Sequence, residues 1–276
     1  MLTLLPANIV ELAVLLAPGM SYFVAVQSSD HEQRFLLCIH PLVHCFSRRR
    51  VNYSIMASKI ELYSLATPNG IKVSVALEEM GLEYNAHTID LFNGGQFKPE
   101  FVAVNPNAKI PAITDPNGPD GKPIHLFESG AILIYLAEKT GKFLPADPRL
   151  RYETIQWLFF QMAGVGPMFG QFAHFYKYAT EKCKDPYPLE RYSTEAKRLL
   201  GVLEKRLEGR QFLVGEQYTI ADMATFPWVR FFETGLNAAE YLGFSNFTNV
   251  VAWKDRCMER PATAKGLNVC PLPPGV

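Results

Sequence analysis

The residues best placed to do chemistry are Thr67 and Asn69, in the segment Thr67-Pro68-Asn69-Gly70. The residues before this segment alternate as in a β-strand, and those after it repeat as in an amphipathic helix. A polar turn between a strand and a helix exposes backbone N–H groups at the positive end of the helix dipole. Thr67 and Asn69 add side-chain donors, so this corner is expected to bind an anion. The alternative interpretation is that both residues only form the turn.

Three further polar segments lie near the ends of predicted elements. Residues 94–101 form a glycine-rich loop that runs into a short helix, which Pro99 can start. Residues 105–113 contain the Ile110-Pro111 bond, which can adopt the cis form before a short strand. Glu128, Ser129 and Gly130 open a third helical pattern, so their backbone and side chains are expected at a helix start.

The elements that position these segments are predicted in the order β-α-β-α-β-β-α between residues 56 and 141. Strands are expected at 59–64, 84–90, 112–114 and 123–127, because hydrophobic residues alternate there or turn signals flank them. Gly81 and Gly141 are placed to end the two longer helices.

Residues 148–270 are expected to be all helical, after a short linker at Asp147-Pro148. Residues 164–167, Gly-Val-Gly-Pro, are expected to kink or break the helix that precedes them. Thr219 and Asp222 have the spacing of a capping box, to which we assign a structural role. The aromatic residues within 169–178 are expected to be core more than pocket lining.

Composition narrows the choice of partners. The 276 residues contain 27 Lys and Arg and 27 Asp and Glu, so neither general polyanion binding nor a nucleic-acid partner is supported. The five cysteines are odd in number and lack C-x-x-C or zinc-site spacing. A reducing, cytoplasmic location without a metal site is therefore expected.

Residues 1–55 differ from the rest and are expected to lie outside the fold. The apolar stretch 2–20 is interrupted by Pro6, Glu11 and Pro18, and no membrane span is expected there. A mispredicted start, with the protein opening at Met56, is one interpretation. A targeting segment, which would make the location mitochondrial, is the second, and a separate domain is the third.

Four segments together resemble the glutathione transferases: TPNG at 67–70, GGQFKPEF at 94–101, NPNAKIPAI at 105–113 and FESGAILIYLAEKTG at 127–141. The match is close to the nu class and to the related fungal family that contains the yeast nitrogen-regulator prion protein. It runs from about Ile60 to Ala264. The resemblance implies an α+β fold, with a thioredoxin-like N-terminal domain (56–141) followed by an all-α C-terminal domain (148–270). It also implies a homodimer.

The resemblance makes glutathione the cosubstrate, with no metal, and it assigns a role to each candidate residue. Thr67 and Asn69 would stabilise the glutathione thiolate and so be catalytic. Since thioredoxin-like redox proteins carry cysteines at this corner and this chain does not, the sulfur must arrive with glutathione. Lowering a thiol pKa of about 8.5 by two units needs roughly 2.7 kcal/mol of preferential thiolate stabilisation.

The remaining candidates would bind the rest of the tripeptide. Ser129 suits the γ-glutamyl carboxylate at its helix start, and Glu128 suits the ammonium group. The backbone of Ile110 could pair with the cysteinyl part like a strand, while Gln96 and Lys109 reach the glycine carboxylate. The family position matched by Arg191 helps to bind a second glutathione moiety. Tyr63 lies within a predicted strand, and we expect it to pack and not to activate a thiol.

The nu-class resemblance implies glutathione-dependent reduction of a small disulfide. Two alternatives remain open: conjugation of an electrophile by the same thiolate, and a non-catalytic regulatory or ligand-binding protein on the same fold. The yeast regulator carries an Asn-rich segment ahead of its fold. Residues 1–55 contain only Asn8 and Asn52, which argues against that close analogy.

Overall fold

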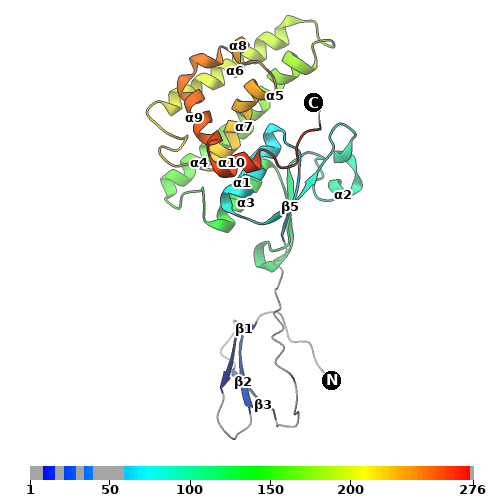
Figure 1. Cartoon of the computed structure of the whole chain (residues 1–276), viewed down its shortest axis with the longest axis vertical. Helices are drawn as coiled ribbons and strands as arrows, with labels where there is room; N and C mark the ends of the chain where they lie inside the picture. The colour runs from blue at the N-terminus through cyan, green and yellow to red at the C-terminus, as the bar shows by residue number, and fades with distance from the viewer. Residues whose placement is uncertain (1–8, 16–21, 29–33, 40–58, 274–276) are drawn as a thin grey trace. The chain divides into compact units, whose positions relative to one another are not determined.

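The computed structural model describes residues 9–15, 22–28, 34–39 and 59–273 (Figure 1), and the chain divides into two compact units. In the first unit, Met1–Met56, strands β1 (Ile9–Leu15), β2 (Tyr22–Ser28) and β3 (Arg34–Ile39) form an antiparallel sheet. The expected start at Met56 lies outside the described residues. Whether residues 1–55 belong to the mature protein, and where the domain boundaries fall, stay predictions.

The second unit, Ala57–Val276, begins with a mixed four-stranded sheet. Its strands are β4 (Ile60–Ser64), β5 (Tyr84–Thr88), β6 (Ala112–Asp115) and β7 (Ile124–Phe127), in the order β5-β4-β6-β7. β4 runs parallel to β5 and antiparallel to β6, and β7 is antiparallel to β6. The predicted strands are thus confirmed, with small shifts at their ends.

Helices α1 (Pro68–Met80), α2 (Pro99–Val102) and α3 (Ser129–Thr140) complete this domain (Figure 1). Gly81 and Gly141 end α1 and α3 in left-handed backbone, at φ 70° and 66°, as the sequence predicted. Helices α1 and α3 pack against each other, and α1 also packs against α7 and α10 of the following helical domain. Almost every residue of α1 is therefore buried, including polar ones.

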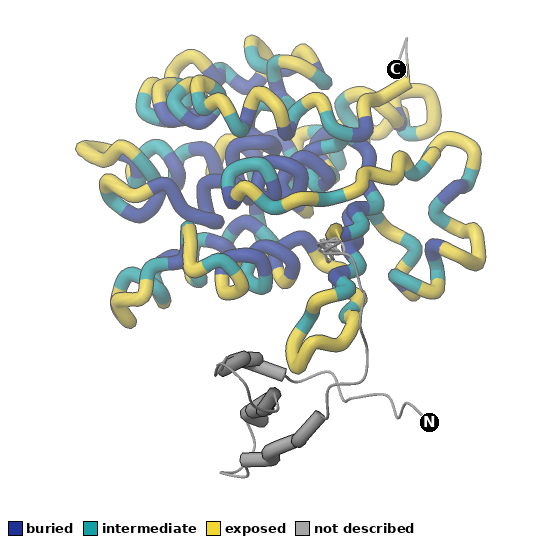
Figure 2. The backbone as a smooth tube through the Cα atoms, turned by 60° about the horizontal axis from the view of Figure 1, so that its bottom comes forward, coloured by how far each residue is buried: buried dark blue, intermediate teal, exposed yellow. Residues whose placement is uncertain are grey.

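The helical domain confirms the predicted fold class. Its helices are α4 (Pro148–Phe160), α5 (Gly166–Ala173), α6 (Pro186–Leu207), α7 (Ile220–Thr234), α8 (Ala239–Leu242), α9 (Thr248–Met258) and α10 (Pro261–Gly266). Helix α7 is buried from Ile220 to Val229. Figure 2 shows the buried backbone in the central helices and the exposed backbone in the outer turns.

The capping box at the start of α7 is present, in its predicted structural role. The Asp222 carboxylate accepts hydrogen bonds of 2.9 Å from the backbone N–H groups of Thr219 and Leu213. It also accepts one of 2.9 Å from the Trp253 indole N–H. These bonds satisfy a fully buried carboxylate and tie α7 to α9 and to the loop before it.

The expected break at residues 164–167 takes a different form. A π-helical turn over Gln161–Val165 joins α4 to α5, and Val165 and Gly166 keep helical backbone angles. The wider turn absorbs an extra residue, so Pro167 falls in the first turn of α5, where no N–H is needed. The chain therefore stays helical there.

The aromatic residues of 169–178 divide between core and surface. Phe169 and Phe172 are buried and pack on Phe232, with ring centroids 4.5 and 5.9 Å away. Tyr178 is 57% exposed, and His174 is also exposed. The expectation of a core role is thus confirmed for the two buried phenylalanines.

Candidate functional site

The candidate anion corner lies between β4 and α1. Thr67 is the N-cap of α1, and its Oγ accepts a hydrogen bond of 3.4 Å from the Gly70 N–H. Since that oxygen accepts, the Thr67 hydroxyl hydrogen remains able to donate. A Cβ at position 70 would lie 1.9 Å from the Leu65 carbonyl oxygen, so only glycine allows this tight corner. Thr67, a predicted site residue, is therefore both the cap of α1 and an available donor.

The Asn69 side chain is oriented by a tryptophan from the helical domain. The indole Nε1–H of Trp228, in α7, donates to Asn69 Oδ1 at 2.9 Å. An indole N–H is a donor only, so the amide must present its oxygen to Trp228 and is left with its NH₂ group to donate. Within residues 59–273 that NH₂ group has no hydrogen-bond acceptor. Gly166 and Gly170 approach the Trp228 ring closely, where added Cβ atoms would lie 3.5 and 3.4 Å from it.

The sequence analysis did not identify Trp228 as a partner of Asn69, although one feature of the sequence pointed to a buried polar contact of this tryptophan. A tryptophan within a hydrophobic helix must find an acceptor for its N–H when buried. Trp228 is 9% exposed, and the acceptor comes from 159 residues earlier in the chain. Nothing in the spacing indicates which acceptor it would find.

The start of α3 holds Glu128 and Ser129. Glu128 is exposed and has φ 68°, a left-handed backbone conformation that costs about 1–3 kcal/mol for a non-glycine residue. That turn places Ser129 as the first residue of α3, 6% exposed, with its backbone N–H at the positive end of the helix. Both features suit the binding of a carboxylate at Ser129.

A buried lysine, also missed by the sequence reasoning, connects Ser129 to α1. Lys72 Nζ donates to Ser129 Oγ at 3.3 Å and to Gln161 Oε1 at 2.7 Å. Burial lowers the pKa of Lys72 to about 7, against the opposing effect of the Glu128 charge. The first two turns of α1 thus bring Thr67 and Asn69 together with Ser129. The hydrophobic periodicity of α1 does not distinguish Lys72 from the other polar residues of the helix, so it does not predict that Lys72 is buried.

Ile110 lies beside the corner through the sheet register. Ala112 in β6 pairs antiparallel with Tyr63 in β4, and extending that register places Ile110 opposite Leu65, just before the corner. The Ile110-Pro111 bond is cis, as expected from the sequence. The backbone N–H and C=O of Ile110 have no hydrogen-bond partners within residues 59–273, so they are free to pair with an extended peptide.

Gln96 and Lys109 reach the same region from two loops. The Gly95 N–H donates to the Asp90 carbonyl at 2.7 Å, which holds the Gln96 loop at the carboxyl end of β5, next to β4. Gln96 Oε1 is buried and has no partner among the described residues. Lys109 is exposed, and its carbonyl accepts a hydrogen bond of 2.6 Å from the Asn105 side chain. The exposed Lys109 cation fits an incoming carboxylate, whereas the unpartnered Gln96 oxygen is an acceptor and fits a donor such as a peptide N–H.

Arg191 is the predicted residue that the structure does not connect to the others. Arg191 lies exposed on α6. The pKa of Glu195 on the same helix is lowered mainly by its hydrogen bond from Arg198, and the charge of Arg191 adds to this effect. In the described part of the chain Arg191 makes no hydrogen bond or ion pair with the remaining candidates. A bound ligand would have to bridge the distance.

Two neighbours of the corner have structural roles. Tyr63 stacks on His87, with ring centroids 5.0 Å apart, and contacts Phe101, as expected for a packing residue. The Ala66 N–H donates to the Cys270 carbonyl at 2.8 Å, so the C-terminal segment passes the corner. Burial raises the pKa of the Cys270 thiol, which keeps it protonated and a poor nucleophile. Burial likewise raises the pKa of the Cys257 thiol in α9.

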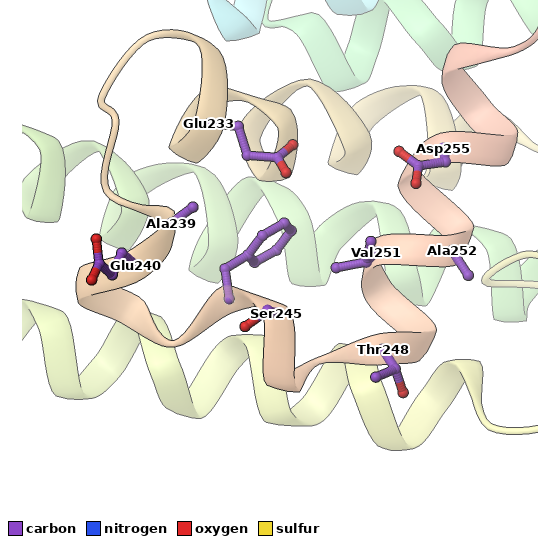
Figure 3. Close-up of a pocket in the computed structure, with 9 residues that line it drawn as sticks. Glu233, Ala239, Glu240, Ser245, Thr248, Val251, Ala252 and Asp255 are labelled. Atoms are coloured by element: carbon purple, nitrogen blue, oxygen red, sulfur yellow. The ribbon is translucent and has the colours of Figure 1, made fainter.

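A pocket of about 520 Å³ lies elsewhere, between α7, α8 and α9 (Figure 3). Glu233, Glu240 and Asp255 line it, together with the ring of Phe244. Lys254 is ion-paired with both Glu233 and Asp255, at 2.5 and 3.1 Å. The carboxylates that line this pocket would repel a ligand that itself carries two carboxylates, so we do not assign glutathione to this pocket.

A smaller apolar pocket of about 290 Å³ adjoins Glu128 between α3 and α4, where Met162 and Phe159 line it. Within residues 59–273 and the three described strands before them, no helix is long and apolar enough to cross a membrane. Over the same residues, no group of three or more His, Cys, Asp or Glu side chains is placed to hold a metal ion.

Comparison with known proteins identifies the fold and its relatives. Residues 67–139 match the model of the glutathione S-transferase N-terminal domain, and residues 162–261 match that of the C-terminal domain. The disulfide-bond oxidoreductase YfcG of Escherichia coli (strain K12) is 48% identical over 209 residues, covering 75% of this chain and 94% of the relative.

Solved structures agree with these matches. A glutathione transferase from Pseudomonas putida, with one glutathione disulfide bound per subunit, is 53% identical with TM-score 0.74, covering 76% of this chain and 91% of that one. A glutathione transferase family member from Pseudomonas fluorescens, with two glutathione bound, is 53% identical with TM-score 0.76, covering 79% and 96%.

Proposed function

The chain belongs to the glutathione S-transferase family, and we propose that it activates the thiolate of glutathione to reduce small disulfides. The observation that carries this proposal is the orientation of Asn69. Trp228 binds the Asn69 carbonyl oxygen, and the NH₂ group of Asn69, at the N-terminus of α1, has no acceptor among the residues that the structure describes. A thiolate in the corner would accept from that group, from the Thr67 hydroxyl and from the helix terminus.

The energetic requirement is modest. A thiolate fraction sufficient at neutral pH needs the bound thiol pKa lowered by about two units, or roughly 2.7 kcal/mol. A hydrogen bond to a charged group contributes about 1.5–3 kcal/mol, and a helix terminus contributes about 0.3–1 kcal/mol. Two side-chain donors and one helix terminus therefore suffice, even if neither hydrogen bond is ideal.

The remaining site residues bind the peptide part of glutathione in this proposal. Ser129 and its backbone N–H hold the γ-glutamyl carboxylate, and Glu128 pairs with the ammonium group. The free backbone groups of Ile110 pair with the cysteinyl residue. The exposed Lys109 and the NH₂ group of Gln96 bind the glycine carboxylate, and the unpartnered Gln96 oxygen accepts from a peptide N–H of the ligand.

The reaction proceeds as two thiol–disulfide exchanges. The bound thiolate attacks one sulfur of the disulfide, forms a mixed disulfide with glutathione, and releases the other sulfur as a thiolate, which takes a proton. A second glutathione thiolate then attacks the glutathione sulfur of the mixed disulfide. Glutathione disulfide and the second thiol are the products, so two glutathione molecules are oxidised for each disulfide reduced.

The second glutathione is the role proposed for Arg191. The Pseudomonas fluorescens relative binds two glutathione molecules, and the Pseudomonas putida relative binds one glutathione disulfide per subunit. An exposed guanidinium on α6 can bind a carboxylate of the second molecule through a bidentate pair. Replacing Arg191 with alanine is expected to lower disulfide reduction more than conjugation, which consumes a single glutathione.

The direct test compares glutathione-dependent reduction of hydroxyethyl disulfide with conjugation of chlorodinitrobenzene. We expect reduction to dominate in the wild-type protein and to fall at least tenfold in Asn69→Ala, the loss of about one charge-assisted hydrogen bond. Absence of turnover with both substrates would refute an enzymatic function and favour a binding or regulatory role. Dominant conjugation would make the protein an electrophile-conjugating transferase.

We also propose a homodimer in a reducing, cytoplasmic compartment. Phe159 is 60% exposed beside the apolar pocket between α3 and α4, and a second copy would cover it. Cys183, Cys257 and Cys270 are free thiols, as expected for a reducing compartment. Sedimentation as a monomer at micromolar concentration would refute the dimer, and localisation of the tagged full chain tests the compartment.

A further inference from the structure

Lys72 is a buried lysine that has no counter-ion in the described part of the chain. It is 1% exposed, and its Nζ contacts Gln161 Oε1 at 2.7 Å, Ser129 Oγ at 3.3 Å and Met162 Sδ at 3.9 Å. All three partners are neutral, and no carboxylate lies within ion-pair distance of Lys72 among the described residues. Burying an ammonium group without a counter-ion lowers the stability of the folded state, and an apolar side chain of the same length would fill the space with a smaller loss of stability.

The other charged groups on the elements around α1 do not neutralise Lys72. Glu128 is the charged residue whose field reaches it, and it stands exposed at the start of α3. The remaining acidic groups each have a partner other than Lys72: Glu78 pairs with Tyr84, Glu79 with Arg260, Glu138 with Arg151, Glu233 with Lys254, and Asp222 with the cap of α7. Among the basic groups, Lys139 pairs with Asp115 and Arg230 lies near Glu233. Lys265 is exposed on α10. The positive charge therefore remains available to a ligand.

We propose that Lys72 is the buried counter-charge for the γ-glutamyl carboxylate of glutathione, acting as a positioning residue through the Ser129 hydroxyl. The proposal rests on the proposed function, which places that carboxylate at Ser129. Lys72 donates to Ser129 Oγ, and the Ser129 hydroxyl donates to Met162 Sδ at 3.7 Å. A thioether sulfur is a weak acceptor, so a carboxylate would take over this hydrogen. A carboxylate that accepts this hydrogen at about 2.7 Å would lie no more than about 6 Å from the ammonium group.

Gln161 holds the ammonium group in place without cancelling its charge. It comes from the π-helical turn between α4 and α5, is fully buried, and directs its carbonyl oxygen at Lys72. Its Nε2 is buried without a partner among the described residues, and an added Cβ at Gly166 would come within 2.8 Å of it. The helical domain thus contributes to the glutathione site through a neutral, tightly packed support.

This arrangement couples glutathione binding to a proton. In the free protein, burial lowers the pKa of Lys72 to about 7, so most of it is neutral at pH 8. At about 6 Å and an effective dielectric of about 20, a carboxylate favours the charged amine about a hundred-fold. Binding at pH 8 should therefore take up most of a proton, and affinity should fall about 25-fold as pH rises from 7 to 9.

The test is calorimetric titration of the full chain with S-methylglutathione, which has no ionisable thiol. Measured at pH 8 in buffers of different ionisation enthalpy, the wild-type protein should take up most of one proton per site. Lys72→Met should take up none and bind at least ten-fold more weakly. Lys182→Met, a matched change at an exposed lysine, should behave like the wild type.

Melting temperature provides the readout that a structural role would not give. Without ligand, Lys72→Met should melt above the wild type, because a buried charge has been removed. If Lys72→Met does not fold, the wild-type protein alone still tests the role of Lys72, because that role requires proton uptake on binding and a fall in affinity above pH 7. Binding without proton uptake, or equal uptake by Lys72→Met, overturns this inference alone. Absence of wild-type binding overturns the proposed function together with it.

Discussion

Replacing Trp228 with phenylalanine removes the indole N–H that binds Asn69 Oδ1 and keeps most of the aromatic volume. The Asn69 amide would then lose its orientation, and its NH₂ group would no longer be held toward the corner. Losing one neutral hydrogen bond costs about 1 kcal/mol, so thiolate stabilisation and kcat/KM should fall about fivefold. The pKa of bound glutathione should rise correspondingly.

The assay is reduction of hydroxyethyl disulfide, together with a double-mutant cycle. If Trp228 acts through Asn69, Trp228→Phe should have little further effect in an Asn69→Ala background. Trp157→Phe serves as the matched control, because Trp157 packs on Phe160 in α4 and not on Asn69. Additive losses in the cycle, or an equal loss in Trp157→Phe, would refute the reasoning.

Three further changes test the site and its support. Thr67→Ala should lose about 1 kcal/mol of stability with the cap and at least ten-fold in activity, whereas Thr67→Ser should retain both; equal activity of the two variants would contradict the role of the hydroxyl. Burial lowers the Lys72 pKa from 10.5 to about 7, so the unfolded state binds more protons and stability should rise between these pH values. In denaturant titrations, Lys72→Met should lack this rise and should be more stable than the wild type by a few kcal/mol, at most about 5, at pH 7. The same dependence of stability on pH in Lys72→Met and the wild type would contradict the lowered Lys72 pKa. Asp222→Ala should cost about 3 kcal/mol or more in urea unfolding, because it leaves buried donors of Thr219, Leu213 and Trp253 unpaired, and a cost below 1 kcal/mol would be inconsistent.

The local features of the fold could be predicted because neighbouring residues determine them. Thr67 caps α1, Gly81 and Gly141 end helices in left-handed backbone, and Asp222 completes a capping box three residues after Thr219. Each of these depends on a few consecutive positions, and the strands and helices follow from the same short-range patterns. The Ile110-Pro111 bond, likewise, is cis as expected.

The support of the site could not be predicted, because it depends on long-range contacts. Trp228 meets Asn69 across 159 residues of chain, and Lys72 meets Gln161 across 89. Hydrophobic periodicity marks both helices as amphipathic but does not say which polar groups will meet across the two domains. The π-helical turn that presents Gln161 was likewise hidden, since glycine and proline suggested a break at that position.

The roles predicted for Thr67 and Asn69 came from the family resemblance, and the structure adds a physical observation that is compatible with them. The sequence alone left open whether they only form a turn. The contact with Trp228 leaves the Asn69 amide donor free, and the Gly70 contact leaves the Thr67 hydrogen free. The catalytic roles of Thr67 and Asn69 stay predictions until the variants are assayed.

The central claim is that this corner stabilises a thiolate carried by glutathione. The most direct measurement is the ultraviolet absorbance of the thiolate of protein-bound glutathione as a function of pH, in the wild type and in Asn69→Ala. We predict a bound thiol pKa near 6.5 in the wild type, about two units below the free thiol, and a return toward 8.5 in Asn69→Ala. A wild-type value near 8.5, or one that Asn69→Ala leaves unchanged, would contradict the claim.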